Sequence, residues 1–174
     1  YDIDPRNDPT FQFDLIILKD VIEHIHDQEK FMKHLGNFMN PGAVVFFGFP
    51  PWYMPWGGHQ QVCKSGFLSK LPYYHLLPGV LYAGILRMFG ESKETIEGLM
   101  EIKETGISIE RFERIARQNE FKIVEKIDYL VNPIYQLKFG LKPRKTWRFF
   151  RHIPVLRNFY TSCMYYLIEK RAGS

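Results

Sequence analysis

Several polar side chains in this sequence have residue types and a spacing suited to acid–base or metal chemistry. Asp20, Glu23, His24 and His26 follow directly on the apolar run Phe13–Lys19. Carboxylates and imidazoles at this spacing bind divalent ions or transfer protons near neutral pH. A structural alternative is that Glu23 and His24 brace a turn between a strand and a helix. The sequence leaves all three alternatives open, and we assign no metal ligand from it.

A further histidine, His59, lies in a loop between Gly57-Gly58 and Gln60-Gln61. A hydroxyl that acts as a nucleophile must lose its proton, and an imidazole accepts a proton near neutral pH. His59 is therefore our leading candidate for a catalytic base, and His24 is the second. The alternative, in which His59 only hydrogen-bonds a loop carbonyl, stays equally open.

The elements that must position these residues are two apolar runs with a helix between them. Phe13–Lys19 and Ala43–Phe49 are short and continuous, which predicts parallel strands covered on both faces. Asp27 predicts the N-cap of the intervening helix, and Asn40-Pro41-Gly42 predicts its end. This order predicts a right-handed parallel unit whose two carboxyl ends share one edge of a sheet.

Further along the chain, helices come before two more strands. Residues 64–106 are predicted as mainly helical. Residues 109–118 are predicted as an amphipathic helix that Ser108 caps and that Asn119 ends in a left-handed conformation. Residues 121–130 and 160–170 are predicted as strands. The fold class is therefore α/β.

Composition fits a single globular domain of 174 residues, with 45% hydrophobic and 24% charged residues. Cys63 and Cys163 have no companion at metal-ligand spacing, which favours small core residues in a reducing compartment. We therefore expect a cytoplasmic protein. The uncharged stretch Leu71–Leu86 is too short and too interrupted by prolines to span a membrane.

Positive charge is concentrated in one part of the chain. Residues 138–157 contain seven Lys or Arg and no carboxylate, in a protein of net charge +4. Aromatic residues such as Trp147 and Phe149 alternate with these cations. The segment predicts contact with a membrane surface, which would make the protein peripheral to the membrane, or with an anionic ligand. The alternative is an ordinary solvated face. We do not expect nucleic acid as a partner, because no RNA-reading motif accompanies the segment.

The order of these motifs resembles the class I S-adenosylmethionine-dependent methyltransferases. In that family the fourth strand leads into a D-x-x-E-H segment, here Asp20–His24. A Pro-Gly turn, here Asn40-Pro41-Gly42-Ala43, then precedes a fifth strand that ends in proline, here Pro50. Ala43 replaces a second glycine of the family pattern. Residues 119–121 resemble the family's turn into strand six, with asparagine in place of glycine.

The resemblance implies a partial Rossmann-like methyltransferase sheet, with strands four and five parallel and strands six and seven antiparallel. Residues 1–174 form one partial domain, and residues 51–107 form a lid-like helical insertion within it. The implied cofactor is S-adenosylmethionine. The residues that the resemblance places beside it are Asp2, Lys19, Asp20 and Val21.

In the family, acceptor contacts come from the loop after strand five and from the insertion. The aromatic and aliphatic side chains there predict a small, rather apolar acceptor that is methylated on oxygen or nitrogen. Ordinary core packing is the alternative explanation. The substrate-binding candidates are Trp52, Trp56, Gln60, Tyr74 and His75. Some RNA and ubiquinone-pathway members hold a divalent metal with E-x-x-E-H carboxylates and histidine. Here Asp20 replaces the first glutamate, and His59 is a further candidate ligand.

The family's glycine-rich cofactor loop is the main departure, because no G-x-G-x-G occurs in the sequence. We therefore expect this chain alone to bind the cofactor weakly and to be inactive. Without the family's first three strands, the edge of Phe13–Lys19 is open, which predicts a homodimer or another assembly through that edge. The alternative to an enzyme is a non-catalytic binding module that uses its basic aromatic surface.

Overall fold

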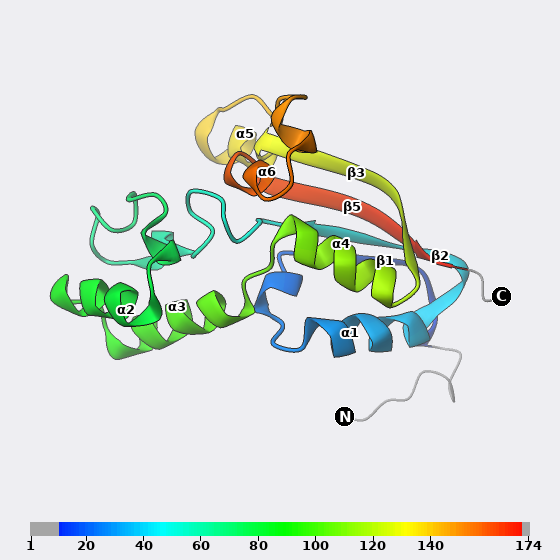
Figure 1. Ribbon diagram of the computed structural model, residues 1–174, viewed down its shortest axis with the longest axis horizontal. Coiled ribbons are helices and arrows are strands. Elements are labelled where there is room, and N and C mark those ends of the chain that lie inside the picture. Colours follow the sequence, from blue (N-terminus) through cyan, green and yellow to red (C-terminus); the bar gives the residue numbers. More distant parts are fainter. Residues whose placement is uncertain (1–10, 172–174) are drawn as a thin grey trace.

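The computed structural model describes residues 11–171, which fold around a five-stranded mixed sheet. The strand order is β1-β2-β5-β3-β4 (Figure 1). β1 and β2 are parallel, whereas β5 is antiparallel to both β2 and β3. The strands are β1 (Phe13–Lys19), β2 (Met39–Phe49), β3 (Phe121–Val131), β4 (Arg144–Lys145) and β5 (Cys163–Lys170). The α-helices are α1 (Gln28–Leu35), α2 (Gly79–Met88), α3 (Lys93–Thr105), α4 (Ile109–Gln118), α5 (Ile134–Phe139) and α6 (Leu156–Phe159).

This topology confirms the predicted fold class. The parallel pair β1 and β2 and the antiparallel pair β3 and β5 have the directions expected for strands four and five and for strands six and seven. The short strand β4 pairs with β3 at the far edge and was not predicted. β2 begins at Met39, so the Pro-Gly turn lies within the strand as an irregular start and does not precede it.

The helices begin where the capping residues predict. The Asp27 carboxylate accepts a hydrogen bond from the Lys30 amide at 2.9 Å and opens α1. The Ser108 hydroxyl accepts from the Arg111 amide at 3.1 Å and opens α4. At the end of α4 the prediction was wrong by one residue. The left-handed residue is Glu120, with a φ of 62°, and not Asn119.

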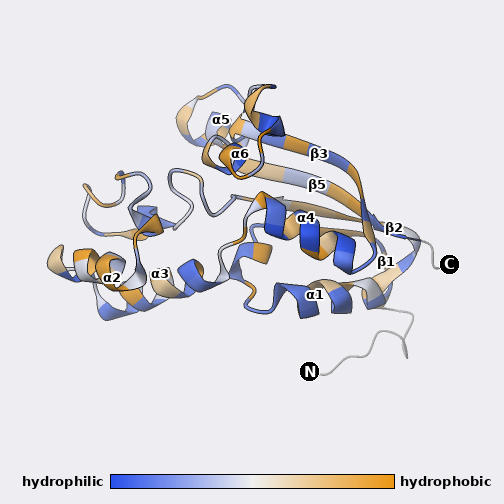
Figure 2. Cartoon of the chain, viewed as in Figure 1, coloured by the Kyte–Doolittle hydropathy of each residue, from blue (hydrophilic) through white to orange (hydrophobic). Residues whose placement is uncertain are grey.

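One face of the sheet is covered by α1 and α4, which lie along it in Figure 1. Figure 2 shows both helices with hydrophilic residues interspersed among hydrophobic ones, as expected for helices with one buried side. The core between these helices and the sheet is apolar and tightly buried. It includes Met32 and Leu35 of α1, Phe112 and Ile115 of α4, and Val45, Phe47, Tyr166 and Ile168 of β2 and β5.

The opposite face of β1 is not covered in the same way. Leu15 and Ile17 are 53% and 63% exposed, and Phe13 on the same face is also exposed. The prediction that β1 is covered on both faces is therefore wrong for the part of the chain that the structure describes. Within that part, β1 pairs with β2 alone, so its other edge is open, as the sequence predicted.

A buried carboxylate joins α4 to the strands beneath it. Glu113 accepts hydrogen bonds from Lys126 at 2.9 Å, from the Tyr166 hydroxyl at 2.9 Å and from Arg157 at 3.0 Å. Burial alone would raise the pKa of Glu113, but the hydrogen bonds from Lys126 and Arg157 outweigh it and lower the pKa. The network ties α4, β3, β5 and α6 together, and the amphipathic pattern gave no sign of it.

Residues 51–107 pack largely on one another. Most of their buried apolar side chains form a second cluster that is separate from the core of the sheet, with Leu68, Tyr82, Leu86 and Leu99 fully buried, whereas Ile107 belongs to the core of the sheet. The insertion thus has its own core, and its role as a lid stays a prediction. Among the described residues, no helix combines the length and the apolarity needed to cross a bilayer.

We propose that the open edge and the exposed apolar face of β1 mediate self-association. Replacing both Leu15 and Ile17 with lysine should weaken dimers at least tenfold, because it places two charges on the contact. Analytical ultracentrifugation measures the dissociation constant. As a control, Val80→Lys in α2 alters a residue that is 86% exposed and lies away from β1, and it should leave the constant unchanged. A wild-type chain that sediments as a monomer at all concentrations contradicts the proposal.

Candidate functional site

The carboxyl ends of β1 and β2 lie side by side and form the floor of the candidate site. Their parallel register extends to Lys19 opposite Gly48. Beyond it, the Asp20 amide donates a hydrogen bond to the Gly48 carbonyl at 2.7 Å. Asp20 has a φ of 54°, and this left-handed conformation turns the chain sharply out of the strand. In open α/β sheets, ligands bind at this edge.

The structure brings together three of the side chains that the sequence singled out. Glu23 and His24 lie in a short 3₁₀ turn after β1, and His59 reaches them from the loop after β2. The rings of His24 and His59 have their centroids 5.2 Å apart. One ligand atom from each of Glu23, His24 and His59 lies within 4.8 Å of the other two. His26, by contrast, lies outside this cluster and contacts Glu101 at 3.1 Å.

Burial differs across the three side chains. Glu23 is 3% exposed, His59 is half-buried and His24 is exposed. Neither carboxylate oxygen of Glu23 has a hydrogen-bond partner among residues 11–171. Buried carboxylates are normally paired, so this one marks a place where a proton or a ligand is needed.

Burial also shifts the ionisation of these groups. It raises the pKa of Glu23 to about 7, because the charged form loses its hydration. It lowers the pKa of His59, and the neighbouring His24 lowers that pKa further. A neutral His59 has a free lone pair, so it can accept a proton or bind a cation.

Two glycines bring His59 to this position. A Cβ on Gly57 would lie 2.2 Å from the Trp52 carbonyl oxygen, and one on Gly58 would lie 2.4 Å from the His75 Cβ. No larger residue fits either position without displacing the loop. The backbone can therefore pass close to the insertion and present His59, in a left-handed conformation with a φ of 54°, to His24.

Three of the residues predicted to contact the cofactor, Lys19, Asp20 and Val21, lie at the same end of the sheet. Lys19 and Asp20 form an exposed ion pair, and the hydrogen bond that Lys19 donates to the Asp20 carboxylate raises the pKa of Lys19. Val21 follows at the start of the turn and is half-buried. Asp2 lies outside the described residues. The cofactor roles of all four stay predictions.

The predicted substrate-binding residues are largely engaged in holding the insertion together. His75 is fully buried and shares a hydrogen bond with the Trp52 carbonyl at 2.9 Å, and burial lowers its pKa to about 4. Gln60 donates hydrogen bonds to two loop carbonyls. Tyr74 is buried against Tyr82, and burial raises its pKa. Trp56 donates to the Lys70 carbonyl at 3.1 Å. These positions favour the packing alternative, most clearly for His75, although substrate contact stays a prediction.

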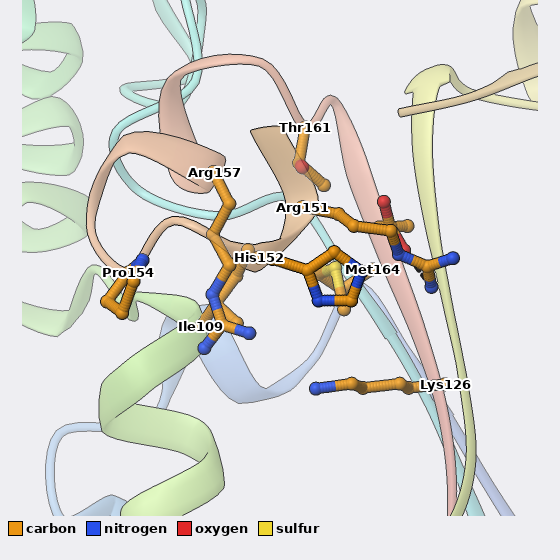
Figure 3. Close-up of a pocket in the computed structure, with 9 residues that line it drawn as sticks. Ile109, Lys126, Arg151, His152, Pro154, Arg157, Thr161 and Met164 are labelled. Carbon is orange, nitrogen blue, oxygen red and sulfur yellow. Dashed lines mark ion pairs between the residues drawn. The ribbon is translucent and has the colours of Figure 1, made fainter. Parts of the chain in front are cut away.

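The structure also contains a cavity that the sequence did not predict. It lies between α4, β3 and the segment 151–164, and Figure 3 shows Lys126, His152 and Arg157 around it. Arg157 is ion-paired with Glu110 at 2.8 Å and with Glu113 at 3.0 Å, Lys126 is paired with Glu113, and Arg151 is paired with Asp128 at 2.7 Å. Because its cations are already neutralised, we assign this cavity no ligand.

A comparison with known protein families gives a match in the N-terminal part of the chain. Residues 2–57 match a family model described as a methyltransferase domain, which is about a third of the chain. This stretch contains β1, α1, β2 and the candidate site up to Gly57. The match, together with the order and direction of the strands, confirms the resemblance to the class I S-adenosylmethionine-dependent methyltransferases.

Solved structures resemble the chain over its whole length at low identity. One is described as a SAM-dependent methyltransferase, "possible histamine N-methyltransferase", from Thermotoga maritima, with 11% identity and a TM-score of 0.49 over 91% of this chain. Another is PKMT2 from Rickettsia typhi, with 12% identity and a TM-score of 0.47 over 98% of this chain. The chain spans 56% and 37% of the length of these two structures. No curated protein matches the sequence.

Replacing Gly58 with alanine should destabilise the protein by about 1–3 kcal/mol, because the new methyl group overlaps the buried His75 side chain. Urea unfolding followed by circular dichroism measures the change. Gly66→Ala is the matched control, since a Cβ there has no atom within 4 Å. Equal stability of the two variants would show that the loop does not depend on this close approach.

Proposed function

We propose that this chain forms part of an enzyme that transfers a methyl group from S-adenosylmethionine to oxygen or nitrogen of a small, rather apolar acceptor. The observation that carries the proposal is the methyltransferase-domain match over residues 2–57, which ends in the loop that leads to His59. The sulfonium of this cofactor already has a good leaving group. The protein's task is therefore to align the acceptor, exclude water and remove a proton.

The proton acceptor in this proposal is a histidine of the pair His59 and His24, with His59 preferred. His59 is half-buried and its lowered pKa keeps it neutral at pH 7. A neutral imidazole beside the open edge of the site accepts a proton from a hydroxyl or an ammonium group. The apolar nature of the acceptor rests on the aromatic residues of the loop after β2, of which Trp56 is exposed.

The sequence contains no G-x-G-x-G motif, which in the resembled family forms the loop that binds the cofactor. Residues 1–174 alone should bind S-adenosylmethionine weakly or not at all and should have no activity. Calorimetric titration of this chain is the direct test, and a micromolar dissociation constant contradicts it. A glycine-rich motif encoded within about a hundred residues before Tyr1 supports the enzyme over a non-catalytic binding module.

The role of His59 is tested in the longest natural form of the chain that binds the cofactor. His59→Asn should lower kcat by about 10²- to 10⁴-fold, because it removes the proton acceptor. Asparagine is chosen because it tolerates the left-handed backbone at this position. In the wild type, kcat/KM should fall as the pH drops below 6.5, because the base must be unprotonated and its pKa lies below that value. His26→Asn, at an exposed histidine outside the cluster, should keep the wild-type rate and pH profile. Equal rates for the two variants contradict the assignment.

A further inference from the structure

We propose that residues 136–149 form a basic surface that docks on an anionic phospholipid bilayer. The basic surface comprises the end of α5, the short strand β4 and the turns on either side of β4. Each of its residues except Thr146 is exposed. Docking on a bilayer does not depend on the methyl-transfer proposal, so the two are tested separately.

Large apolar side chains are exposed along the basic surface. Leu137 is 85% exposed and Phe149 is 74% exposed. Phe139, Leu141 and Trp147 are each more than half exposed. Single exposed apolar side chains are ordinary on a protein surface, but five of them in one short segment indicate a site of interaction.

Cations alternate with these apolar side chains along the chain. They are Lys138, Lys142, Arg144, Lys145 and Arg148. None of the five forms an ion pair with another residue in the range 11–171. No Asp or Glu occurs between residues 129 and 168. The positive charge of the basic surface is therefore not neutralised by the described residues, in contrast to the paired cations around the cavity.

The sheet holds the backbone of this segment in place. β4 pairs with the C-terminal end of β3, where Lys145 lies opposite Tyr129. The amide of the buried Thr146 donates a hydrogen bond to the Asp128 carbonyl at 2.9 Å, and its hydroxyl shares one with the Thr161 hydroxyl at 3.2 Å. A surface whose backbone is already bonded to a sheet loses less conformational freedom when it binds.

The combination of charge and apolar exposure favours an anionic bilayer over other partners. Aromatic and leucine side chains insert at the boundary between headgroups and acyl chains, while lysine and arginine contact the headgroups. A second copy of the chain fits less well, because the same cations would face one another. Nucleic acid matches the charge, but it offers no apolar layer that could cover Leu137 and Leu141.

The basic surface lies at the same end of the sheet as the candidate site. β5 is antiparallel to both β2 and β3, so β3 runs in the same direction as β2, and α5 follows the carboxyl end of β3 (Figure 1). Burial raises the pKa of Tyr135 in α5, and the neighbouring Cys163 and Asp20 raise that pKa further. The helix therefore lies near the turn after β1, and docking brings this end of the sheet toward the headgroups.

Sedimentation with vesicles of phosphatidylcholine, with and without about 30% phosphatidylserine, tests the proposal on residues 1–174. The chain should bind only the anionic vesicles, and added salt should weaken binding because it screens the charges. The triple change Lys142→Gln, Arg144→Gln and Lys145→Gln should weaken binding about a hundredfold, since each cation near an anionic bilayer contributes about a factor of five.

A matched control removes the same charge elsewhere. Lys30→Gln, Lys33→Gln and Arg117→Gln change exposed positions on α1 and α4, and this variant should bind anionic vesicles as the wild type does. Unfolding midpoints of the two triple variants show whether each keeps the fold.

The apolar contact has a separate readout that leaves the charges intact. Tryptophan emission should shift to shorter wavelength when anionic vesicles are added, because the Trp147 indole enters a less polar environment. Trp147→Phe retains Trp52 and Trp56 and should abolish that shift. Trp147→Ser with Phe149→Ser should weaken vesicle binding at least tenfold, because less apolar area is removed from water.

Three results on vesicles would overturn the proposal: no binding by the wild type, equal loss in both triple variants, or wild-type affinity in the double serine variant. Tighter binding to a single-stranded oligonucleotide than to anionic vesicles would overturn it in favour of nucleic acid. All of these measurements are made without S-adenosylmethionine, so each such result leaves the methyl-transfer proposal standing.

Discussion

The parallel pairing of β1 with β2 is the constraint on which the candidate site depends. Because the two strands run in the same direction, the turn after β1 and the loop after β2 leave the sheet at one edge. The hydrogen bond between Asp20 and Gly48 continues this pairing into the turn. A slip of one residue would turn every β1 side chain to the opposite face and separate Glu23 from His59.

The insertion provides the second constraint, because it fixes the loop that carries His59. Gly57 and Gly58 pass within contact distance of Trp52 and His75, and the buried His75 is bonded to the Trp52 carbonyl. Protonating His75 would place an unpaired charge in this core, which agrees with its strongly lowered pKa. The fully buried His75 thus helps to hold the loop that carries the half-buried His59.

Local signals in the sequence were sufficient for most of the fold. The Asp27 and Ser108 caps and the apolar runs were predicted because each depends on residues close together in the chain, whereas the directions of the last two strands came from the family resemblance. The prediction failed where distant segments decide the outcome. The exposed face of β1, the Glu113 network and the burial of His75 all depend on what packs against a residue from elsewhere in the chain.

The same distinction applies to the site. The sequence grouped Glu23 and His24 with His59 downstream, but it did not show that the Glu23 carboxylate is buried beside both histidines without a hydrogen-bond partner among the described residues. Such a carboxylate costs several kcal/mol unless a proton or a cation compensates it. Within residues 11–171 the outer edge of β1 also has no strand paired with it. The unpaired backbone of β1 and the unpaired carboxylate of Glu23 therefore lie on one strand and on the turn that follows it. A strand that paired with that edge would therefore lie next to the turn that carries Glu23.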